Sequence, residues 1–221
     1  MTEIHPIPLG FDTCYVLRNQ GVVVIDAGQP NRVDAFLRGL QMASVRPEDV
    51  DLVLLTHAHW DHMGSAAGIR AETGAPLAVH HSEASWVEEG NPPLPSGLTK
   101  WGSIFMALHR LALPLIKLAP AQVDIRLNDS SWSLQDFGIP GFAIPTPGHS
   151  RGSVSVILDS GEAFVGDLAM NRLPLTLSPS LSIFGDDRDI VKRSWNRVVS
   201  HGAKKIYPAH GEPFPVEALE T

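Results

Sequence analysis

The stretch at residues 54–65, LLTHAHWDHMGS, places three histidines and one aspartate within six residues, directly after an apolar run. The run that leads into it, DLVLLT (51–56), is continuous and apolar, which is typical of a strand buried on both faces of a sheet. The polar cluster therefore begins where a predicted strand ends. A solvated loop has no need of so many ligand-type side chains, and a core tolerates them only when they are paired.

The spacing within this cluster suits metal ligands. In extended backbone, side chains two residues apart project to the same side, so His57 and His59 can reach one metal ion. Asp61 and His62 lie beyond a change of direction and suit a second ion. Imidazole nitrogen and carboxylate oxygen are ligands that zinc accepts, and catalytic zinc sites leave one position for water. The alternative is a surface histidine cluster, which the total of only ten histidines disfavours.

Three further ligand candidates follow predicted strands later in the chain. His149 lies in TPGHSRGS, Asp167 in FVGDLAM and His210 in YPAHGEP, each after an apolar run and close to glycine or proline. Tight turns of glycine and proline fix the backbone direction, so they can aim polar side chains into a common cleft. A single loop histidine is more often a surface or core residue, but together the three candidates complete two coordination shells.

Strand and helix patterns alternate in the first half of the chain, and the second half is rich in strands. We expect helix 31–42 to have Asn31 as its N-cap and helix 186–202 to bury one apolar face. The predicted face of the first helix consists of Val33, Phe36, Leu37 and Leu40, and that of the second of Ile190, Val191, Trp195, Val198 and Val199. Other predicted helices are 65–74 and 82–90, and the predicted strands are 14–17, 22–26, 51–56, 76–80, 142–146, 153–159, 163–167 and 205–208.

Composition limits the class of protein. The 221 residues are 43% hydrophobic and 19% charged, which predicts one globular domain over residues 1–221. The formal net charge of −7 argues against a nucleic-acid partner, because such binding needs clustered lysine and arginine. The first residues resemble no secretory signal, so we expect a cytoplasmic protein. The single cysteine, Cys14, excludes an internal disulfide, and its strand-like surroundings favour a buried inert thiol over a reactive one.

The ordered pieces HAHWDH, GHS, VGD and PAHG, preceded by IDAG, resemble the metallo-β-lactamase superfamily over most of the chain. The resemblance implies an α/β fold of the α+β kind, in which two mixed β-sheets and flanking helices form a four-layer αβ/βα sandwich. It also implies a binuclear metal site along one edge. The implied ligands are His57, His59 and His149 for the first ion, Asp61, His62 and His210 for the second, and Asp167 as a bridge.

Details within the superfamily narrow the expected activity. Asp167 is similar to the bridging residue of glyoxalase II-like and lactonase-like hydrolases rather than true β-lactamases, and His59 disfavours a flavo-diiron oxygen-reducing site. Asp26 resembles the structural aspartate of the family, which would orient a ligand histidine, although a simple turn residue is an equally good interpretation. Glyoxalase II proper carries an added C-terminal helical domain, whereas this sequence ends eleven residues after His210, so glutathione specificity is not expected.

These features predict a hydrolase that uses two divalent ions, with Zn²⁺ first and iron or manganese as alternatives. Two ions that share a water lower its pKa, so that a metal-bridging hydroxide can attack a carbonyl, and a thioester, lactone or related ester is the expected substrate. Asp61, which could relay a proton, and Asp167 are the predicted catalytic residues. The alternatives are a mononuclear iron sulfur dioxygenase that oxidises a persulfide, a nuclease, and a non-catalytic metal-binding module.

Residues 91–119 are rich in proline at the start and strongly apolar after Trp101. Lys117 and Pro114 disfavour a membrane span, so we predict a kinked helical insertion beside the active site. It could be a hydrophobic lid that favours an apolar acyl group of a small-molecule substrate, a homodimer surface, or a core helix. Outside the insertion, Arg151 is either a contact for an anionic substrate group or a solvated loop arginine. Trp60 and Tyr207 are expected to pack near the cleft.

Overall fold

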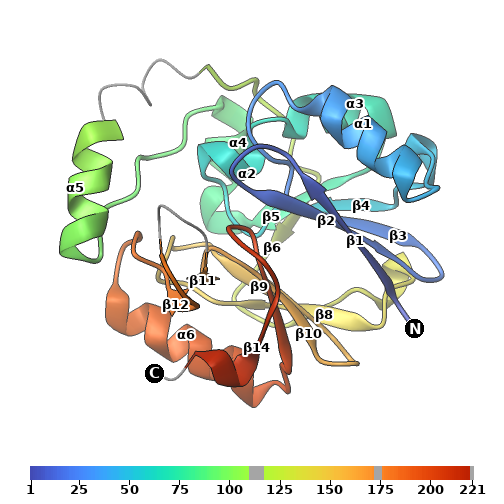
Figure 1. The fold of residues 1–221 in the computed structure, drawn as a ribbon. Coiled ribbons are helices and arrows are strands. Elements are labelled where there is room, and N and C mark those ends of the chain that lie inside the picture. The colour runs from blue at the N-terminus through green and yellow to red at the C-terminus, as the bar shows by residue number, and fades with distance from the viewer. Residues whose placement is uncertain (110–116, 172–175, 220–221) are drawn as a thin grey trace.

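Two β-sheets pack face to face between helices in the computed structural model (Figure 1). The structure describes residues 1–109, 117–171 and 176–219. In the first sheet the strand order is β1-β2-β3-β4-β5-β6, antiparallel from β1 to β3 and parallel from β3 to β6. Its strands are β1 (Glu3–Pro8), β2 (Thr13–Arg18), β3 (Val22–Ile25), β4 (Leu52–Leu54), β5 (Leu77–His80) and β6 (Ile125–Leu127).

The second sheet has the order β14-β13-β10-β9-β8-β7, in which only β10 and β13 pair in parallel. Its strands are β7 (Trp132–Ser133), β8 (Gly141–Pro145), β9 (Val154–Leu158), β10 (Glu162–Gly166), β13 (Lys205–Pro208) and β14 (Phe214–Pro215). The short strands β11 (Ala169–Met170) and β12 (Ser180–Leu181) pair separately. Both sheets are therefore mixed, as expected for the predicted fold.

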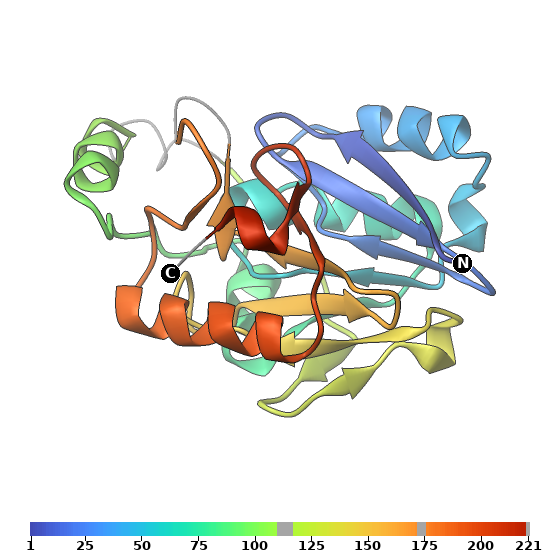
Figure 2. The same cartoon turned by 60° about the horizontal axis from the view of Figure 1, so that its bottom comes forward.

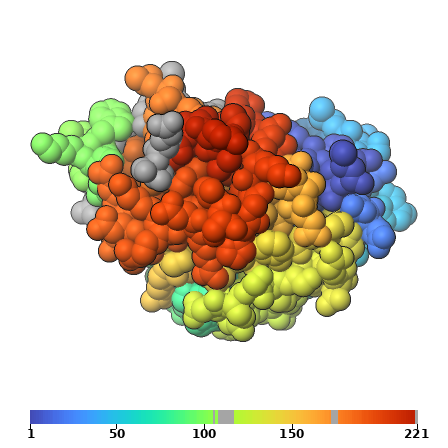
Figure 3. All heavy atoms as spheres, turned by 90° about the horizontal axis from the view of Figure 1, so that it is seen from below, coloured from blue at the N-terminus to red at the C-terminus, as the bar shows by residue number. Residues whose placement is uncertain are grey.

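Helices cover the outer faces of both sheets. The helices are α1 (Val33–Met42), α2 (Trp60–Met63), α3 (Ala66–Thr73), α4 (Ala84–Glu89), α5 (Lys100–His109) and α6 (Arg188–Ser200). Figure 1 shows α1 and α3 above the first sheet, and Figure 2 shows α6 along the underside of the second. Seen from below, α6 and the C-terminal segment occupy the middle of that face (Figure 3).

Three apolar clusters fill the spaces between the layers. One joins the first sheet to α1, α3 and α4, and includes Phe36 and Ile69. The second lies between the two sheets and includes Leu54 and Phe164, which come from opposite sheets. The third packs Trp195 of α6 against the second sheet. Three clusters between four layers confirm the αβ/βα sandwich that the resemblance implies.

The predicted strands and helices are present, but the strands β1, β6, β7, β11, β12 and β14 and the short helix α2 were not predicted, and two details of the predicted helices differ. Strand β1 was not predicted because Pro6 and Pro8 interrupt it, and proline is tolerated there because β1 is an edge strand. The Asn31 N-cap is wrong: Asn31 has a φ of 62°, α1 begins at Val33, and the preceding Arg32 N–H donates to Ser65 Oγ. The buried face of α6 consists of Val191, Ser194, Trp195 and Val198, whereas Ile190 is half-buried and Val199 is exposed.

The described part of the insertion lies at the periphery of the four layers, where α5 projects to one side (Figure 1). Trp101 and Ile104 are exposed, and Met106 is buried in a small separate cluster with Met170, Ile183 and Phe184. The described part of α5 is therefore not a helix of the main core. The predicted kink at Pro114 falls outside the described residues. Within the described ranges, no helix has the length and apolar content needed to cross a membrane.

Replacing Trp195 by alanine should lower the free energy of unfolding by about 3–5 kcal/mol, because the ring is almost fully buried between α6 and the second sheet. The matched control is Val199→Ala on the exposed side of the same helix, which should change stability by less than about 0.5 kcal/mol. Urea unfolding followed by circular dichroism measures both. Equal effects of the two substitutions would contradict the assigned face of α6.

Candidate metal centre

The seven predicted site residues lie together at one end of the sandwich, and each follows a strand. The chain leaves β4 through Leu55 and Thr56 into the histidine motif, while the loops after β8, β10 and β13 carry His149, Asp167 and His210. Six of the seven side chains are buried, and Asp61 is partly buried. Side chains separated by up to 153 positions in the sequence therefore converge at one site.

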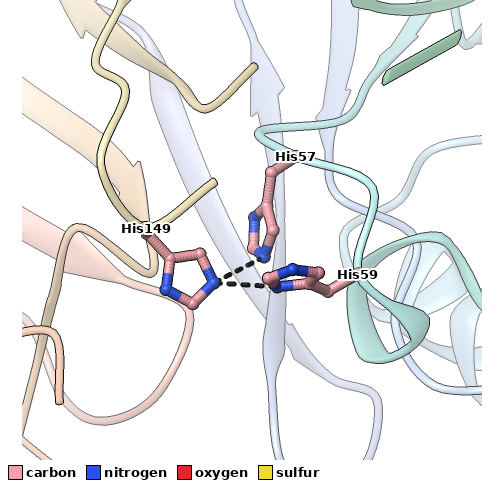
Figure 4. A group of neighbouring side chains, drawn as sticks. All are labelled: His57, His59 and His149. Atoms are coloured by element: carbon pink, nitrogen blue, oxygen red, sulfur yellow. Dashed lines mark hydrogen bonds between the residues drawn. The ribbon is translucent and has the colours of Figure 1, made fainter. Parts of the chain in front are cut away.

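The first set of converging side chains, called here the three-histidine group, consists of His57, His59 and His149 (Figure 4). His59 Nδ1 lies 2.9 Å from His149 Nε2, which in turn lies 3.1 Å from His57 Nε2. The three facing nitrogens come from two loops on different sheets. Only small rearrangements would let them surround one cation.

The outer partners of His57 and His149 assign the inner nitrogens of these two rings as lone pairs. His149 Nδ1 lies 3.1 Å from the Phe184 carbonyl, which only accepts, so this nitrogen carries the proton. His57 Nδ1 faces Thr56 Oγ1. Because the Thr56 hydroxyl donates its own hydrogen to Asp26, His57 Nδ1 is the donor to Thr56 Oγ1 and carries the proton. The two Nε2 lone pairs then face each other at 3.1 Å, which is repulsive. A cation between them removes the repulsion, so the donor set fits a metal ion.

The second set, called here the aspartate–histidine group, consists of Asp61, His62 and His210. His210 Nε2 lies 3.5 Å from Asp61 Oδ2. Asp167 lies between the two groups: its Oδ1 is 3.2 Å from the Nε2 atoms of both His62 and His210, and its Oδ2 is 3.5 Å from His149 Nε2. His62 Nε2 and Asp167 Oδ1 are buried and face each other at 3.2 Å, but the geometry of this contact is not that of a regular hydrogen bond, as is common between two ligand atoms.

Asp26 orients ligand candidates in both groups. One of its oxygens lies 2.9 Å from His62 Nδ1, and the other accepts the Thr56 N–H at 2.7 Å. Asp26 has a φ of 64°, a left-handed conformation that aspartate adopts more readily than most residues. These contacts favour the family interpretation over a simple turn residue. In the same way, His210 donates from Nδ1 to the Phe11 carbonyl at 3.0 Å, which turns Nε2 inward.

The two groups differ in their electrostatics. Burial lowers the pKa of His57 well below its usual value, and the nearby His62 and His149 lower it further. Burial, followed by His149, lowers the pKa of His59 to about 3. Both rings are therefore neutral near pH 7 and can coordinate a cation without losing a proton.

The aspartate–histidine group shows the opposite behaviour. Burial opposes the charged form of His62, but Asp26 and Asp167 outweigh it and raise the pKa of His62 well above its usual value. Asp167 and Asp61 do the same to the pKa of His210 against its burial. Burial acts to raise the pKa of Asp167, yet His210, His62 and His149 hold it well below its usual value. Without a cation, these residues form a buried ion-pair network.

Sequence reasoning missed two buried acidic residues at the site. Both carboxylate oxygens of Asp12 are buried without a hydrogen-bond partner in the described part of the chain, and burial raises its pKa to about 8 while His62 lowers it. Glu83 is fully buried and accepts the N–H groups of Ala58 and Gly152. Neither residue lies in a ligand motif. Asp12 precedes an apolar run, and Glu83 lies in HHSEASW, where no spacing marks it as a site residue.

The remaining sequence candidates lie as follows. Arg151 is exposed and stacks over the Trp86 ring, with its guanidinium carbon 4.7 Å from the ring centroid. Tyr207 packs with Tyr15 and Phe164 in the core between the sheets, rather than in a cleft. Trp60 is the first residue of α2 and is half-buried. Cys14 is buried in β2, and burial raises the pKa of its thiol.

Curated relatives match most of the chain. A probable metallo-hydrolase of Streptococcus pyogenes is 28% identical over 208 residues, covering 91% of this chain and 79% of the relative. A probable metallo-hydrolase of Methanocaldococcus jannaschii is 24% identical and covers 90% and 86%. A metal-dependent hydrolase of Thermococcus onnurineus is 42% identical over a shorter stretch of 62 residues, which covers 27% of this chain and 28% of the relative.

Solved structures share the fold. The BLEG-1 B3 metallo-beta-lactamase superposes with a TM-score of 0.73 at 24% identity, covering 99% of this chain and 95% of that one. TTHA1623, solved in a di-iron-bound form, gives a TM-score of 0.67 at 21% identity and covers 96% and 92%. The model of the metallo-beta-lactamase superfamily matches residues 7–210. With the matching fold and the clustered histidines and aspartates, this match establishes that the chain belongs to the metallo-beta-lactamase superfamily.

Proposed function

We propose that the chain is a metal-dependent hydrolase with a binuclear centre, whose substrates are thioesters, lactones or related esters. The observation that carries the proposal is the place of Asp167, whose two oxygens face the three-histidine group and the aspartate–histidine group respectively. A carboxylate in that place can contact two cations at once. The relatives named as metallo-hydrolases and metal-dependent hydrolases support the same reaction class.

The proposed ligands are those of the two groups, with Asp167 between them. Two divalent ions held there would supply hydroxide at neutral pH, polarise the substrate carbonyl and stabilise the leaving group. Zinc fits the imidazole and carboxylate donors, and iron fits them as well, so the metal in the cell depends on supply as much as on affinity. The di-iron-bound form of the structurally similar TTHA1623 supports testing iron.

The chain's own residues would perform three tasks. Asp26 and the Phe11 carbonyl fix the ring orientations of His62 and His210. Asp61 is the least buried of the seven, so it is the proposed proton acceptor or relay at the open side of the centre. The presence of two groups of possible ligands supports hydrolysis over the mononuclear dioxygenase, because that reaction would need only one of the two groups.

The insertion supports an apolar substrate preference. Leu98 N–H donates to the Ile183 carbonyl at 2.8 Å, and Met106 packs against Ile183 and Phe184. The Phe184 carbonyl accepts a hydrogen bond from His149, so Met106 of the insertion contacts a residue that itself contacts the three-histidine group. The exposed Trp101 and Ile104 provide apolar surface on α5. We propose that the insertion contributes to binding of the acyl group, with dimer formation as the alternative.

A panel of acyl thioesters, lactones and simple esters, with a β-lactam included, tests the proposed function. Purified protein should hydrolyse at least one thioester or lactone, lose the activity after chelation and regain it with Zn²⁺. Oxygen consumption on a persulfide with bound iron would favour the dioxygenase instead. An absence of metal-dependent turnover on every member would favour the non-catalytic module.

The substitution Asp167→Asn should lower the metal content from two ions to about one per chain and reduce turnover at least about 100-fold. Removing a residue that only supports a metal ligand already lowers metal affinity or activity about 10–100-fold, so loss of a ligand should have at least that effect. Asp159→Asn, at an exposed position after β9, is the matched control and should leave both quantities unchanged. Elemental analysis and steady-state kinetics measure them. Two tightly held ions in the Asp167→Asn protein would contradict a bridging role.

Lowering the pH from 8 to 6 should weaken binding of one ion far more than the other. A cation in the aspartate–histidine group must displace protons from His62 and His210, whose pKa values are raised, so its affinity should fall about tenfold per pH unit for each displaced proton. His57 and His59 have lowered pKa values and should bind with little pH dependence. Calorimetry in buffers of different ionisation enthalpy counts the released protons. Equal proton release by both ions would contradict this assignment.

A further inference from the structure

The buried carboxylate of Glu83 links two loops that leave different sheets. Glu83 ends a 3-10 turn, η2 (His81–Glu83), directly after β5, and its side chain is fully buried. Oε2 accepts the N–H of Ala58 at 2.7 Å, and Oε1 accepts the N–H of Gly152 at 2.7 Å. Ala58 separates two members of the three-histidine group, and Gly152 follows the third by three residues. One side chain therefore connects both loops that carry this group.

The linkage requires two acceptors and close approach. A carboxylate offers one oxygen to each N–H, whereas an amide would direct its NH₂ group at one of the two donors. The approach of Glu83 also requires glycine at position 152. A Cβ atom there would lie 2.7 Å from Glu83 Cγ and 2.7 Å from Ser82 Oγ, which is too close. The carboxylate of Glu83 and the glycine at position 152 are thus the residue types that a bridge with two acceptors requires.

The bridge places an ionisable carboxyl group in a fully buried position. Among the described residues, no lysine or arginine forms an ion pair with Glu83. Burial raises the pKa of the carboxyl, while hydrogen bonds from Ser150, Ala58 and Gly152 lower it. Packing between the sheets alone would be served as well by an apolar side chain, which avoids the desolvation of a carboxyl group. The hydrogen bonds to the two loops are the feature that an apolar side chain cannot provide.

We propose that Glu83 is the positioning residue of the three-histidine group, setting the spacing of its two loops and thereby its affinity for a metal ion. The inference rests on the metal binding proposed above. The inner nitrogens meet at 2.9 and 3.1 Å across the gap between the loops. A planar carboxylate that bonds both loops fixes that gap, since its two oxygens cannot move apart. Asp26 contacts His62 directly and reaches His57 only through Thr56, whereas Glu83 bonds both loops of the three-histidine group.

The bridge itself is tested in the metal-free protein. Glu83→Gln keeps the shape of the side chain but leaves one N–H without an acceptor. Glu89→Gln removes the same charge from an exposed position on α4 and is the matched control. Amide hydrogen exchange followed by NMR should be at least about tenfold faster at Ala58 or Gly152 in Glu83→Gln only. Unchanged exchange at both amides would overturn the bridge.

The positioning role is tested by titrating the same proteins with Co²⁺ and with Zn²⁺. Histidine ring ¹⁵N shifts identify which group takes up each ion, and the cobalt spectrum reports its geometry. In Glu83→Gln, the affinity for the ion that shifts the His57 and His149 signals should fall about 10–100-fold. The affinity for the ion that shifts the His210 signal should change less than about threefold. Glu89→Gln should match the wild type for both ions.

The outcomes separate this inference from the proposed function. If the wild-type protein takes up no ion, the proposed metal centre fails, whereas the exchange experiment still decides whether the bridge exists. If the wild type binds two ions and Glu83→Gln binds both equally well, the positioning role is overturned. Equal weakening of both ions would also overturn it, because that result indicates general loosening. As a further variant, Glu83→Asp keeps two acceptors and should recover part of the lost affinity, while no recovery would count against the role of the acceptors.

Discussion

The arrangement of the site depends on imidazole lone pairs that face one another in a buried space. His57 and His149 both use Nδ1 as a donor to outer partners, so their Nε2 atoms meet without a proton between them. The stability of the sandwich holds these atoms in place. The three apolar clusters supply that stability, because they lock the two sheets and their outer helices together.

The connections across the junction of the sheets explain how distant loops keep their places. Val154 N–H donates to the Thr56 carbonyl at 2.8 Å, Thr13 N–H donates to the Ala209 carbonyl at 2.9 Å, and the Tyr15 hydroxyl donates to the Pro208 carbonyl at 2.7 Å. Each joins the first sheet to the second close to a ligand loop. The site is thus built on strand ends that are hydrogen-bonded to each other, which restricts ligand movement more than flexible loops would.

Two kinds of environment coexist within this single site. The three-histidine group is neutral and almost purely imidazole, whereas the aspartate–histidine group contains carboxylates that hold His62 and His210 in their charged form when no cation is present. The Asp167 carboxylate lies close to histidines of both groups, His149 on one side and His210 on the other. A shared carboxylate between unlike donor sets means that cations bound in the two groups would differ in proton balance, as the proposed binuclear centre requires.

The sequence by itself determined the identity of the clustered residues, because strand runs, turn residues and ligand-type side chains are local patterns, and its resemblance to the metallo-β-lactamase superfamily implied the class of the fold. It assigned all seven side chains that the structure brings together, since each follows a strand and tight turns aim it. It could not determine the supporting contacts. Glu83 and Asp12 carry no motif, and their importance arises only when loops of different sheets meet around them. The N-terminal edge strand and the cap of α1 were likewise set by tertiary pairing, which overrides local preference.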